Sequence, residues 1–426
     1  MNFFRGFSLN TTCSFLVFSL GFVNSVLLAD QLGPEHYGTL RLWAALVMLG
    51  VLFLGEWLSK GNIYVVGRER EREAAINHTL LYCLVLGAIL LLTAPFSLAL
   101  AKVFVPSITL VQWVLGICVI AFTVLQRAGL SVFLGEDRLK PYALLPVVFI
   151  AIYLGGNLVL SQLGYLELER VMGVWVGAVG ITGLAIFVLF SYRGFRFRWG
   201  GRRALRQMLR IGSRGEVCLV LMFLLLKSDL FLIERFLGDK EVGVYGVATN
   251  FTDMVQRVAN IASVILLAKI VRGQDDTRLS LGVGQGIFVF SLLSAAVLIF
   301  GGRLLLSVFF PLYPEAYEPL VWLLPGMLFL GFGAVFNAKL MGEGYPSMTL
   351  WAPGVALAVN VALNLLLIPK LGLRGAALST SLAYALWGVL TASYYLRLNR
   401  LGWRAVFALP AFGQEEKSSS KQPPSV

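Results

Sequence analysis

The sequence is poor in the residues on which enzymes and soluble proteins depend. It holds two histidines and four cysteines in 426 residues, and only 14% of its residues are charged. A soluble protein of this size normally carries about 25% charged residues. His36 and His78 fall at the ends of apolar segments, and no two cysteines have the spacing of metal ligands. These scarcities exclude most histidine-based acid–base chemistry and a cysteine-held metal.

The chain also lacks a glycine-rich phosphate-binding loop and a large hydrophilic stretch. Without such a loop we expect no ATP site and no ATP-driven pump. The most hydrophilic segment is the C-terminal end, which finishes in EEKSSSKQPPSV and is expected to be disordered. No catalytic combination of acids, histidines or nucleophiles stands out. We therefore expect a protein that is not an enzyme and that needs no metal or other cofactor.

Long apolar segments make up most of the sequence. The chain is 58% hydrophobic, and a membrane-spanning helix needs about 20 apolar residues. Twelve such segments can be recognised, centred near residues 20, 50, 91, 121, 152, 181, 225, 255, 295, 330, 358 and 385. This pattern predicts an all-α integral membrane protein with about 12 transmembrane helices.

The basic residues behind the net charge of +12 are unevenly distributed between the loops on the two sides of the membrane. If the N-terminus is cytoplasmic, 22 lysines and arginines fall on the inner side, and the outer loops hold Arg41, Lys102, Arg170, Lys240, Lys370 and Arg374. Such an excess is the positive-inside signal, and it predicts that both termini are cytoplasmic. The basic charge is then a feature of topology, and we expect no nucleic-acid partner.

A repeated turn indicates two similar halves. Leu32 to Gly38 reads LGPEHYG, and Leu237 to Gly243 reads LGDKEVG, so both copies are Leu-Gly-x4-Gly at an offset of 205 residues. Six segments in each half start both copies on the same side. The halves are then expected to be related by an axis along the membrane normal.

The repeat divides the chain into four parts. We predict a six-helix bundle at 1–192, a basic cytosolic linker at 193–210, a second six-helix bundle at 211–400 and a largely disordered cytosolic tail at 401–426. The linker region is rich in arginine, as SYRGFRFRWGGRRALRQMLR shows. It is interpreted either as an amphipathic segment lying against anionic lipid or as a plain topology anchor.

The hairpin from Ile211 to Leu267 carries charge where the membrane would be. Its two apolar segments flank the turn DKEVG and place charged side chains at mid-segment, Lys227 and Asp229 in the first and Asp253 and Arg257 in the second. The spacings of three, four and three predict that one face of the second segment carries Asn250, Asp253, Arg257 and Asn260. A charge at the bilayer centre costs at least roughly 2.5–3.5 kcal/mol, so this face indicates a pathway for something polar.

Three stretches resemble a known family. They are LGPEHYGTL, DLFLIERFLGDKEVGVYGVATNFTD and Asn360-x3-Asn364-x4-Pro369-x2-Gly372-x2-Gly375-Ala376-Ala377. The whole chain resembles the Wzx-type polysaccharide-biosynthesis or O-antigen flippases of the multidrug/oligosaccharidyl-lipid/polysaccharide (MOP) exporter superfamily.

The resemblance implies a MATE-like fold of two bundles around a central cavity. It also implies alternating access and movement of an undecaprenyl-pyrophosphate-linked oligosaccharide from the inner to the outer leaflet of the cytoplasmic (inner) membrane. The expected partners are this substrate, membrane lipids and other polysaccharide-assembly proteins. The coupling ion, H+ or Na+, is left open.

Such a substrate needs cations for its phosphates and polar groups for its sugars. The candidate cavity residues are Lys227, Arg257, Asp253, Asp229, Arg127, Arg214, Asn24, Asn250, Asn260, Asn337, Asn360 and Asn364. Where the family commonly carries arginine, this chain has Lys227. Lysine keeps the positive charge but cannot form the two parallel hydrogen bonds that arginine makes to a phosphate. If it receives phosphate, a double neutral variant at Lys227 and Asp253 should stay inactive.

Each candidate also has a plainer interpretation. Lys227 could pair with Asp253, or Asp253 could neutralise Arg257. Arg127 and Arg214 could extend to the membrane interface, and Glu56 could pair with Lys60 one turn later. The asparagines could join helices by hydrogen bonds.

Two other functions remain as alternatives. A cation-coupled multidrug or small-molecule exporter of the same superfamily is expected to place an acid within its first helix, where this chain has only Asp30 at the outer end. A membrane enzyme of glycan assembly would need acids or histidines clustered at one interface, and the outer loops offer only scattered glutamates.

Overall fold

The structure, a computed structural model, describes residues 3–191, 201–213, 216–271, 277–342 and 347–407. Within these residues every regular element is a helix. Nine of the described helices are long and apolar enough to cross a membrane. The expectation of an all-α membrane protein is therefore confirmed.

The first half begins with a long broken helix. Its elements are α1 (Phe3–Gly67), α2 (Arg72–Leu92), α3 (Ala94–Phe104), α4 (Leu110–Gly135), α5 (Leu139–Gln162) and α6 (Leu168–Ser191). Gly33 interrupts α1 with φ of 71°, a conformation that glycine adopts at little cost, and Pro34 then suits the start of a new helix. A similar break at Thr93, two residues before Pro95, separates α2 from α3.

The second half has the same succession of long helices. After α7 (Arg202–Gly212) come α8 (Glu216–Leu237), α9 (Asp239–Val271), α10 (Thr277–Phe309), η1 (Pro314–Ala316), α11 (Tyr317–Gly342), α12 (Met348–Leu371), α13 (Leu373–Leu398) and α14 (Arg404–Phe407). The prediction of a five-residue turn between α8 and α9 is wrong. Only Gly238, with φ of 100°, separates them, because Asp239 to Gly243 form the first turn of α9.

The described helices fit the expected segment centres. The break at Gly33 divides α1 into two segments, and α2 with α3 follows one path through the first half. Helices α8 and α9 are 22 and 33 residues long, although they are not among the nine chosen by composition. The total of twelve spans and the cytoplasmic side of the termini stay predictions.

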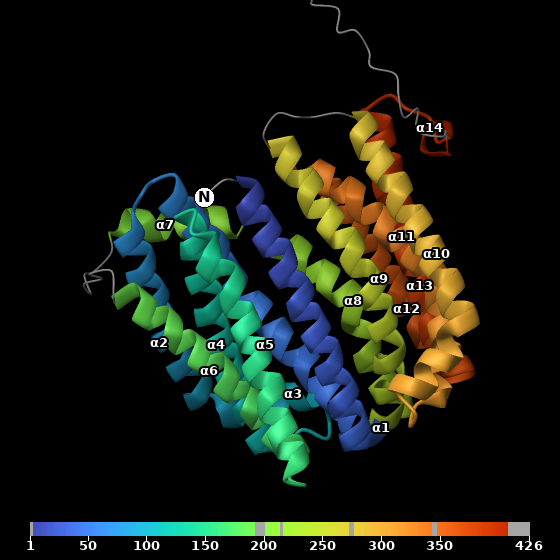
Figure 1. Cartoon of the computed structure of the whole chain (residues 1–426), viewed down its shortest axis with the longest axis horizontal. Coiled ribbons are helices and arrows are strands. Elements are labelled where there is room, and N and C mark those ends of the chain that lie inside the picture. The colour runs from blue at the N-terminus through green and yellow to red at the C-terminus, as the bar shows by residue number, and fades with distance from the viewer. Residues whose placement is uncertain (1–2, 192–200, 214–215, 272–276, 343–346, 408–426) are drawn as a thin grey trace, which may run out of the picture.

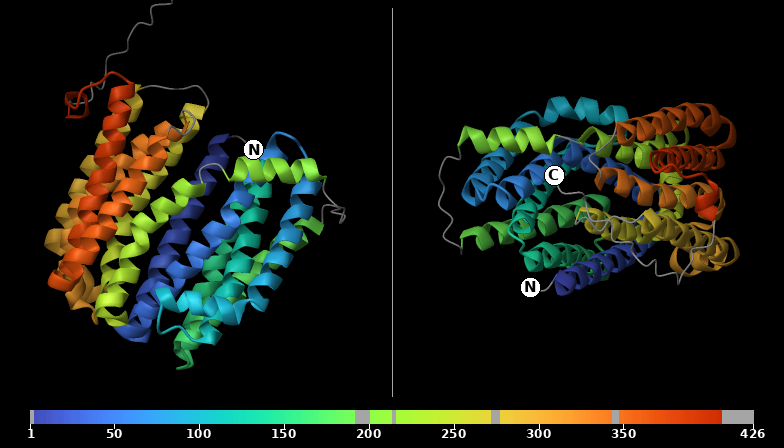
Figure 2. Two further views of the ribbon diagram at one scale, coloured as in Figure 1. Left: turned by 180° about the vertical axis from the view of Figure 1, so that it is seen from behind. Right: turned by 90° about the horizontal axis from the view of Figure 1, so that it is seen from above.

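Two bundles lie side by side, one formed by α1–α6 and the other by α8–α13 (Figure 1). Within the first bundle α1 packs along α4 and α5, and within the second α11 packs along α13 and α9. The bundles meet mainly where α1 contacts α9. Helix α7 lies crosswise at the end where α1 begins (Figure 2).

Each bundle is filled by apolar side chains. In the first, Trp43 is 1% exposed, and its indole Nε1 donates to the carbonyl of Gln112 at 2.8 Å. Large apolar side chains also cover the outside, where Phe300 is 89% and Phe96 is 82% exposed. An apolar exterior of this kind suits contact with lipid rather than with water.

The two copies of the repeated turn meet at the end away from α7. A Cβ atom on Gly38 would lie 1.8 Å from the carbonyl oxygen of Asp239, and one on Gly243 would lie 2.0 Å from that of Pro34. Pro34 and Asp239 occupy the same position in the two copies, so the contact is reciprocal. Glycine is required at both positions because any side chain would collide with backbone.

Candidate functional site

A polar chamber lies at the α7 end, walled by α1, α4 and α5 of the first bundle and by Arg257 from α9 of the second. It has a volume of about 390 Å³ and its wall includes Asn10, Ser14, Glu56, Ser59, Arg127, Ser131, Tyr142 and Arg257. Arg127 reaches the chamber from α4, and its Nη1 lies 3.0 Å from Oε2 of Glu56 on α1. Two of the cations expected in the cavity, Arg127 and Arg257, therefore line it.

The expected pairing of Glu56 with Lys60 is wrong. Glu56 turns to Arg127, while Lys60 Nζ lies 3.4 Å from Oε2 of Glu216 at the start of α8. Helices packed against α1 supply both partners, so contacts between helices prevail over the contact along one helix. The Lys60–Glu216 pair also joins the two halves beside the chamber.

An apolar groove continues from the chamber. It lies between α1, α9 and α10, has a volume of about 800 Å³, and is lined mainly by apolar side chains that include Phe15, Phe18, Phe22, Met254, Val258, Leu293 and Val297. Asn10, Ser14 and Arg257 line both the groove and the chamber. The two spaces therefore meet at these three residues.

Arg257 is the cation at this junction. Its guanidinium lies 5.6 Å from the centre of the Phe18 ring, a distance at which a cation is attracted to the ring. Among the residues that the structure describes, no carboxylate comes within 4.0 Å of it. Asp253, one turn before it on α9, pairs with Lys227 instead, so these two do not neutralise each other. Arg257 thus offers an uncompensated positive charge.

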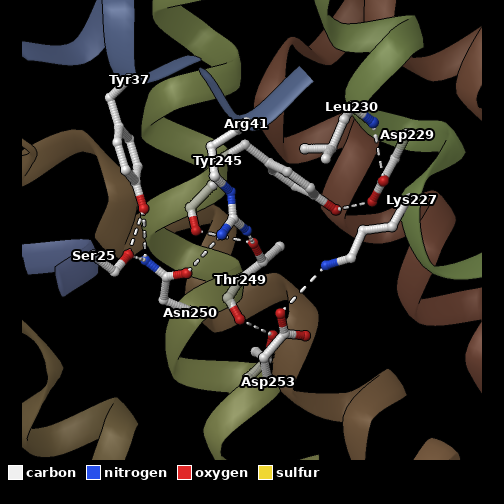
Figure 3. A network of polar contacts seen from close by, with 12 residues as sticks. Ser25, Tyr37, Arg41, Lys227, Asp229, Leu230, Tyr245, Thr249, Asn250 and Asp253 are labelled. Carbon is white, nitrogen blue, oxygen red and sulfur yellow. Dashed lines mark hydrogen bonds and ion pairs between the residues drawn. The ribbon is translucent and has the colours of Figure 1, made fainter. Parts of the chain in front are cut away.

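Lys227 and Asp253 form an ion pair across the α8–α9 hairpin. Lys227 Nζ lies 3.2 Å from Oδ2 of Asp253, with side chains 24% and 51% exposed (Figure 3). Each residue is thirteen positions from Lys240 at the turn, which predicts that they lie at one depth, and the structure brings them together there. The plainer interpretation of Lys227, a partner for Asp253, is the one that this geometry favours.

Arg41 is a functional candidate that the sequence pattern did not reveal. Assigned above to an outer loop, it lies inside α1, about two turns after Pro34. Its guanidinium donates to Asn250 Oδ1 at 3.0 Å and to Thr249 Oγ1 at 3.1 Å, both on α9. A helix that begins at Pro34 includes Arg41, so recognising this helix start in the sequence would have placed Arg41 inside the helix.

Asn250 extends this contact between the halves. Its Nδ2 donates to Ser25 Oγ at 2.9 Å and to Tyr37 OH at 3.1 Å, and it is buried (Figure 3). It therefore joins α9 to both segments of α1. Of the four residues expected on one face of this helix, Asp253, Arg257 and Asn260 are exposed, and Asn260 lines the groove.

A second polar cluster is buried inside the second half. Asp229 is 2% exposed and accepts hydrogen bonds from Tyr245 OH at 2.7 Å, Thr380 Oγ1 at 3.2 Å and the Leu230 amide at 2.9 Å. Asn360 donates to Thr380, and Asn364 donates to Asn360. The packing of α8 against α12 and α13 encloses these residues, and none of them lines the chamber or the groove. Their expected role in substrate binding stays a prediction.

The remaining candidates lie apart from the chamber. Asn24 is buried and accepts from Asn157 Nδ2 at 2.9 Å, so it joins α1 to α5 instead of facing the cavity. Asn337 is half-buried in α11 and contacts Met341. Arg214 lies outside the described residues. The described residues hold no cluster of three or more His, Cys, Asp or Glu that could bind a metal.

The end away from α7 is closed by contacts between the bundles. Asp239 accepts from Thr39 at 2.9 Å and from Ser107 at 3.1 Å, and Tyr313 OH donates to the carbonyl of Ala29 at 2.8 Å. With the glycine contact described above, these bonds seal that end. The chamber therefore lies at one end of a molecule that is closed at the other.

Comparison with known proteins identifies a family. Residues 3–267 match the family described as polysaccharide biosynthesis protein. The chain is 23% identical over 195 residues to the probable low-salt glycan biosynthesis flippase Agl15 of Haloferax volcanii, a match that covers 42% of this chain and 41% of that protein.

Solved structures share the fold. The lipid II flippase MurJ in an inward closed conformation superposes with a TM-score of 0.76 at 15% identity, over 94% of this chain and 89% of that one. An inward-facing multidrug resistance MATE family transporter of the MOP superfamily gives 0.74 at 17% identity, over 90% and 95%. The expected two-bundle transporter fold is confirmed. Because the family match spans more than half of the chain, this protein belongs to the polysaccharide biosynthesis protein family.

Proposed function

We propose that this protein carries a lipid-linked oligosaccharide, of the undecaprenyl-pyrophosphate type, from the inner to the outer leaflet of the cytoplasmic membrane for surface polysaccharide synthesis. The observation that carries the proposal is the junction of a polar chamber with an apolar groove at Arg257. A ligand with a polar head, an anionic linkage and a long apolar tail has the same three parts in the same order.

Each part of such a ligand finds suitable chemistry. The groove offers aromatic and aliphatic side chains to the tail, which can pass from the lipid to the groove without contacting water. Arg257 can give two parallel hydrogen bonds to a phosphate. In the chamber, hydroxyls and amides such as Ser14, Ser131 and Asn10 can replace the water around sugar hydroxyls.

The seal at one end and the chamber at the other suit alternating access. In the proposed orientation the chamber faces the cytoplasm, where the substrate is made. Movement of the bundles would break the bonds to Asp239 and open the sealed end. The membrane lipids that surround the groove are the route by which the tail enters.

The buried cluster around Asp229 is proposed as the coupling-ion site. A carboxylate inside a membrane helix is costly and indicates a functional site. Its described hydrogen-bond partners are all uncharged, and nearby Asn364, which is fully buried, has an Oδ1 atom with no partner. This set of oxygens can hold H+ on Asp229 or coordinate Na+. If transport by the wild type depends on Na+ or on pH, the Asp229→Asn variant should lose that dependence.

The test is transport in proteoliposomes. Purified protein is reconstituted with a fluorescent undecaprenyl-pyrophosphate oligosaccharide, and an added glycosidase reports how much substrate has crossed. We expect faster crossing with the protein than without it. Transport of small cationic drugs but of no lipid-linked sugar would contradict the proposal and favour the multidrug exporter alternative.

A further inference from the structure

Helix α7 has three distinct faces. At about 100° per residue, Ala204, Met208 and Gly212 share one face, and all three are buried. Next around the helix come Leu205 and Leu209, which are 36% and 47% exposed. The rest of the circumference carries exposed arginines, namely Arg202, Arg203, Arg206 and Arg210.

The buried face is fixed against the first half. A Cβ on Gly212 would lie 1.9 Å from the carbonyl oxygen of Trp57, and one on Gly61 would lie 2.8 Å from the Met208 backbone. Such backbone-to-backbone contact leaves α7 little freedom to turn. It lies across the end of the bundle (Figure 2), so its leucines and arginines are held in set directions.

The residues that the structure describes leave the other two faces uncovered. The described residues place no carboxylate within 4.0 Å of the four arginines, and the two leucines are left exposed beside them. Apolar and cationic side chains on adjoining strips of one helix match the boundary between acyl chains and headgroups of an anionic bilayer. A soluble acidic partner would complement the arginines but would leave the leucine strip unexplained.

We propose that α7 is an interfacial helix that binds anionic phospholipid on the side of the membrane where the chamber lies. The leucines enter the acyl boundary, and the arginines contact the phosphates. Since α7 packs on α1 and precedes α8, the bound lipid surface touches the segment that joins the two bundles. This binding is separate from the transported substrate and does not depend on the proposed function.

The experiment measures amide hydrogen exchange of residues 202–212 in nanodiscs of phosphatidylcholine, with and without phosphatidylglycerol. We expect the anionic lipid to slow exchange in the wild type, and high salt to weaken this effect. The variant R203Q/R206Q/R210Q should lose the lipid dependence. Each arginine near an anionic surface contributes about fivefold, so the affinity for that surface should fall about a hundredfold.

Two further variants separate lipid binding from other causes. R68Q/R70Q removes two exposed arginines that lie just beyond α1, at the same end, and should keep the full lipid dependence. L205S/L209S keeps the charge and should exchange faster in both kinds of nanodisc. Equal exchange of wild-type α7 with and without phosphatidylglycerol would overturn the proposal, and so would protection by soluble polyglutamate but not by the bilayer.

Discussion

At the scale of single residues, Arg257 is the side chain on which substrate binding should depend most. We expect Arg257→Ala to reduce transport of the lipid-linked oligosaccharide at least tenfold, because a hydrogen bond to a charged group contributes about 1.5–3 kcal/mol. Arg257→Lys should retain part of it, since the charge stays and the two-pronged contact is lost.

The measurement for Arg257 is the initial rate in proteoliposomes at matched protein content. Arg170→Ala is the matched control, because Arg170 lies at the start of α6, is exposed and has an ion pair of its own with Glu167. Full transport by Arg257→Ala would remove this residue from the proposed phosphate contact.

The ion pair of Lys227 and Asp253 leads to a different expectation. Alone, Lys227→Ala leaves a carboxylate without its partner and should impair transport. Together with Asp253→Asn the charge is balanced again, and we expect transport to recover, which revises the expectation drawn from the sequence. Transport rates of the two single variants and the double variant decide the matter: an inactive double variant would return Lys227 to the role of a substrate cation.

The residues show where prediction from sequence succeeds and where it stops. Depth along the hairpin placed Lys227 opposite Asp253, because two helices joined by a short turn keep equal distances from it. Whether an asparagine faces a cavity or another helix could not be predicted, since Asn24 and Asn157 are neighbours only through the packing of α1 on α5. Arg41 was missed because the helix begins at Pro34, earlier than the apolar pattern suggests.

At the scale of elements, the reciprocal contact of Gly38 and Gly243 should govern the seal. A methyl group at Gly243 would meet the backbone of Pro34, which cannot move aside as a flexible side chain would. We expect Gly243→Ala to hold the sealed end apart and to reduce transport, while the equivalent change Gly173→Ala, in α6 with open space around it, should have no effect.

Labelling can show the change at this seal. A cysteine in place of Phe22, which packs between Phe251 and Phe310, should react faster with a membrane-impermeant maleimide from outside in the Gly243→Ala variant. Unchanged labelling together with normal transport would show that the glycine contact does not control access.

The positions of the apolar helices were the better predicted part of the fold. The length of each apolar segment indicated a helix because this signal is local to the chain. The pairing of helices was not available from the pattern, since apolar faces of similar composition can pack in several ways. The repeated turn was the one sequence feature that reported on the arrangement of the halves, and its two copies do touch. The relation of the two halves by an axis along the membrane normal stays a prediction.

At the scale of the whole molecule, the described lining of chamber and groove combines a neutral pair, Arg127 with Glu56, and the lone charge of Arg257. The empty site is therefore positive. A pyrophosphate, which carries more than one negative charge, would make the loaded site negative. With the proposed substrate, the sign of the charge that the moving site presents would thus reverse on binding.

Because of this reversal, the membrane potential would favour one direction of the transport cycle. An elementary charge moved across the membrane field is worth about 2.3 kcal/mol per 100 mV. With the cytoplasm negative, as in the proposed orientation, voltage would draw the empty, positive site inward and drive the loaded, negative site outward, so both halves of the cycle would run with the field. We expect a potassium diffusion potential, negative on the chamber side, to speed transport by the wild type, and the opposite polarity to slow it. In Arg257→Ala the empty site is neutral, and its return should no longer respond to voltage. The negative charge of the substrate would supply the electrical energy for export, and the unpaired arginine would make the return of the empty site respond to voltage as well.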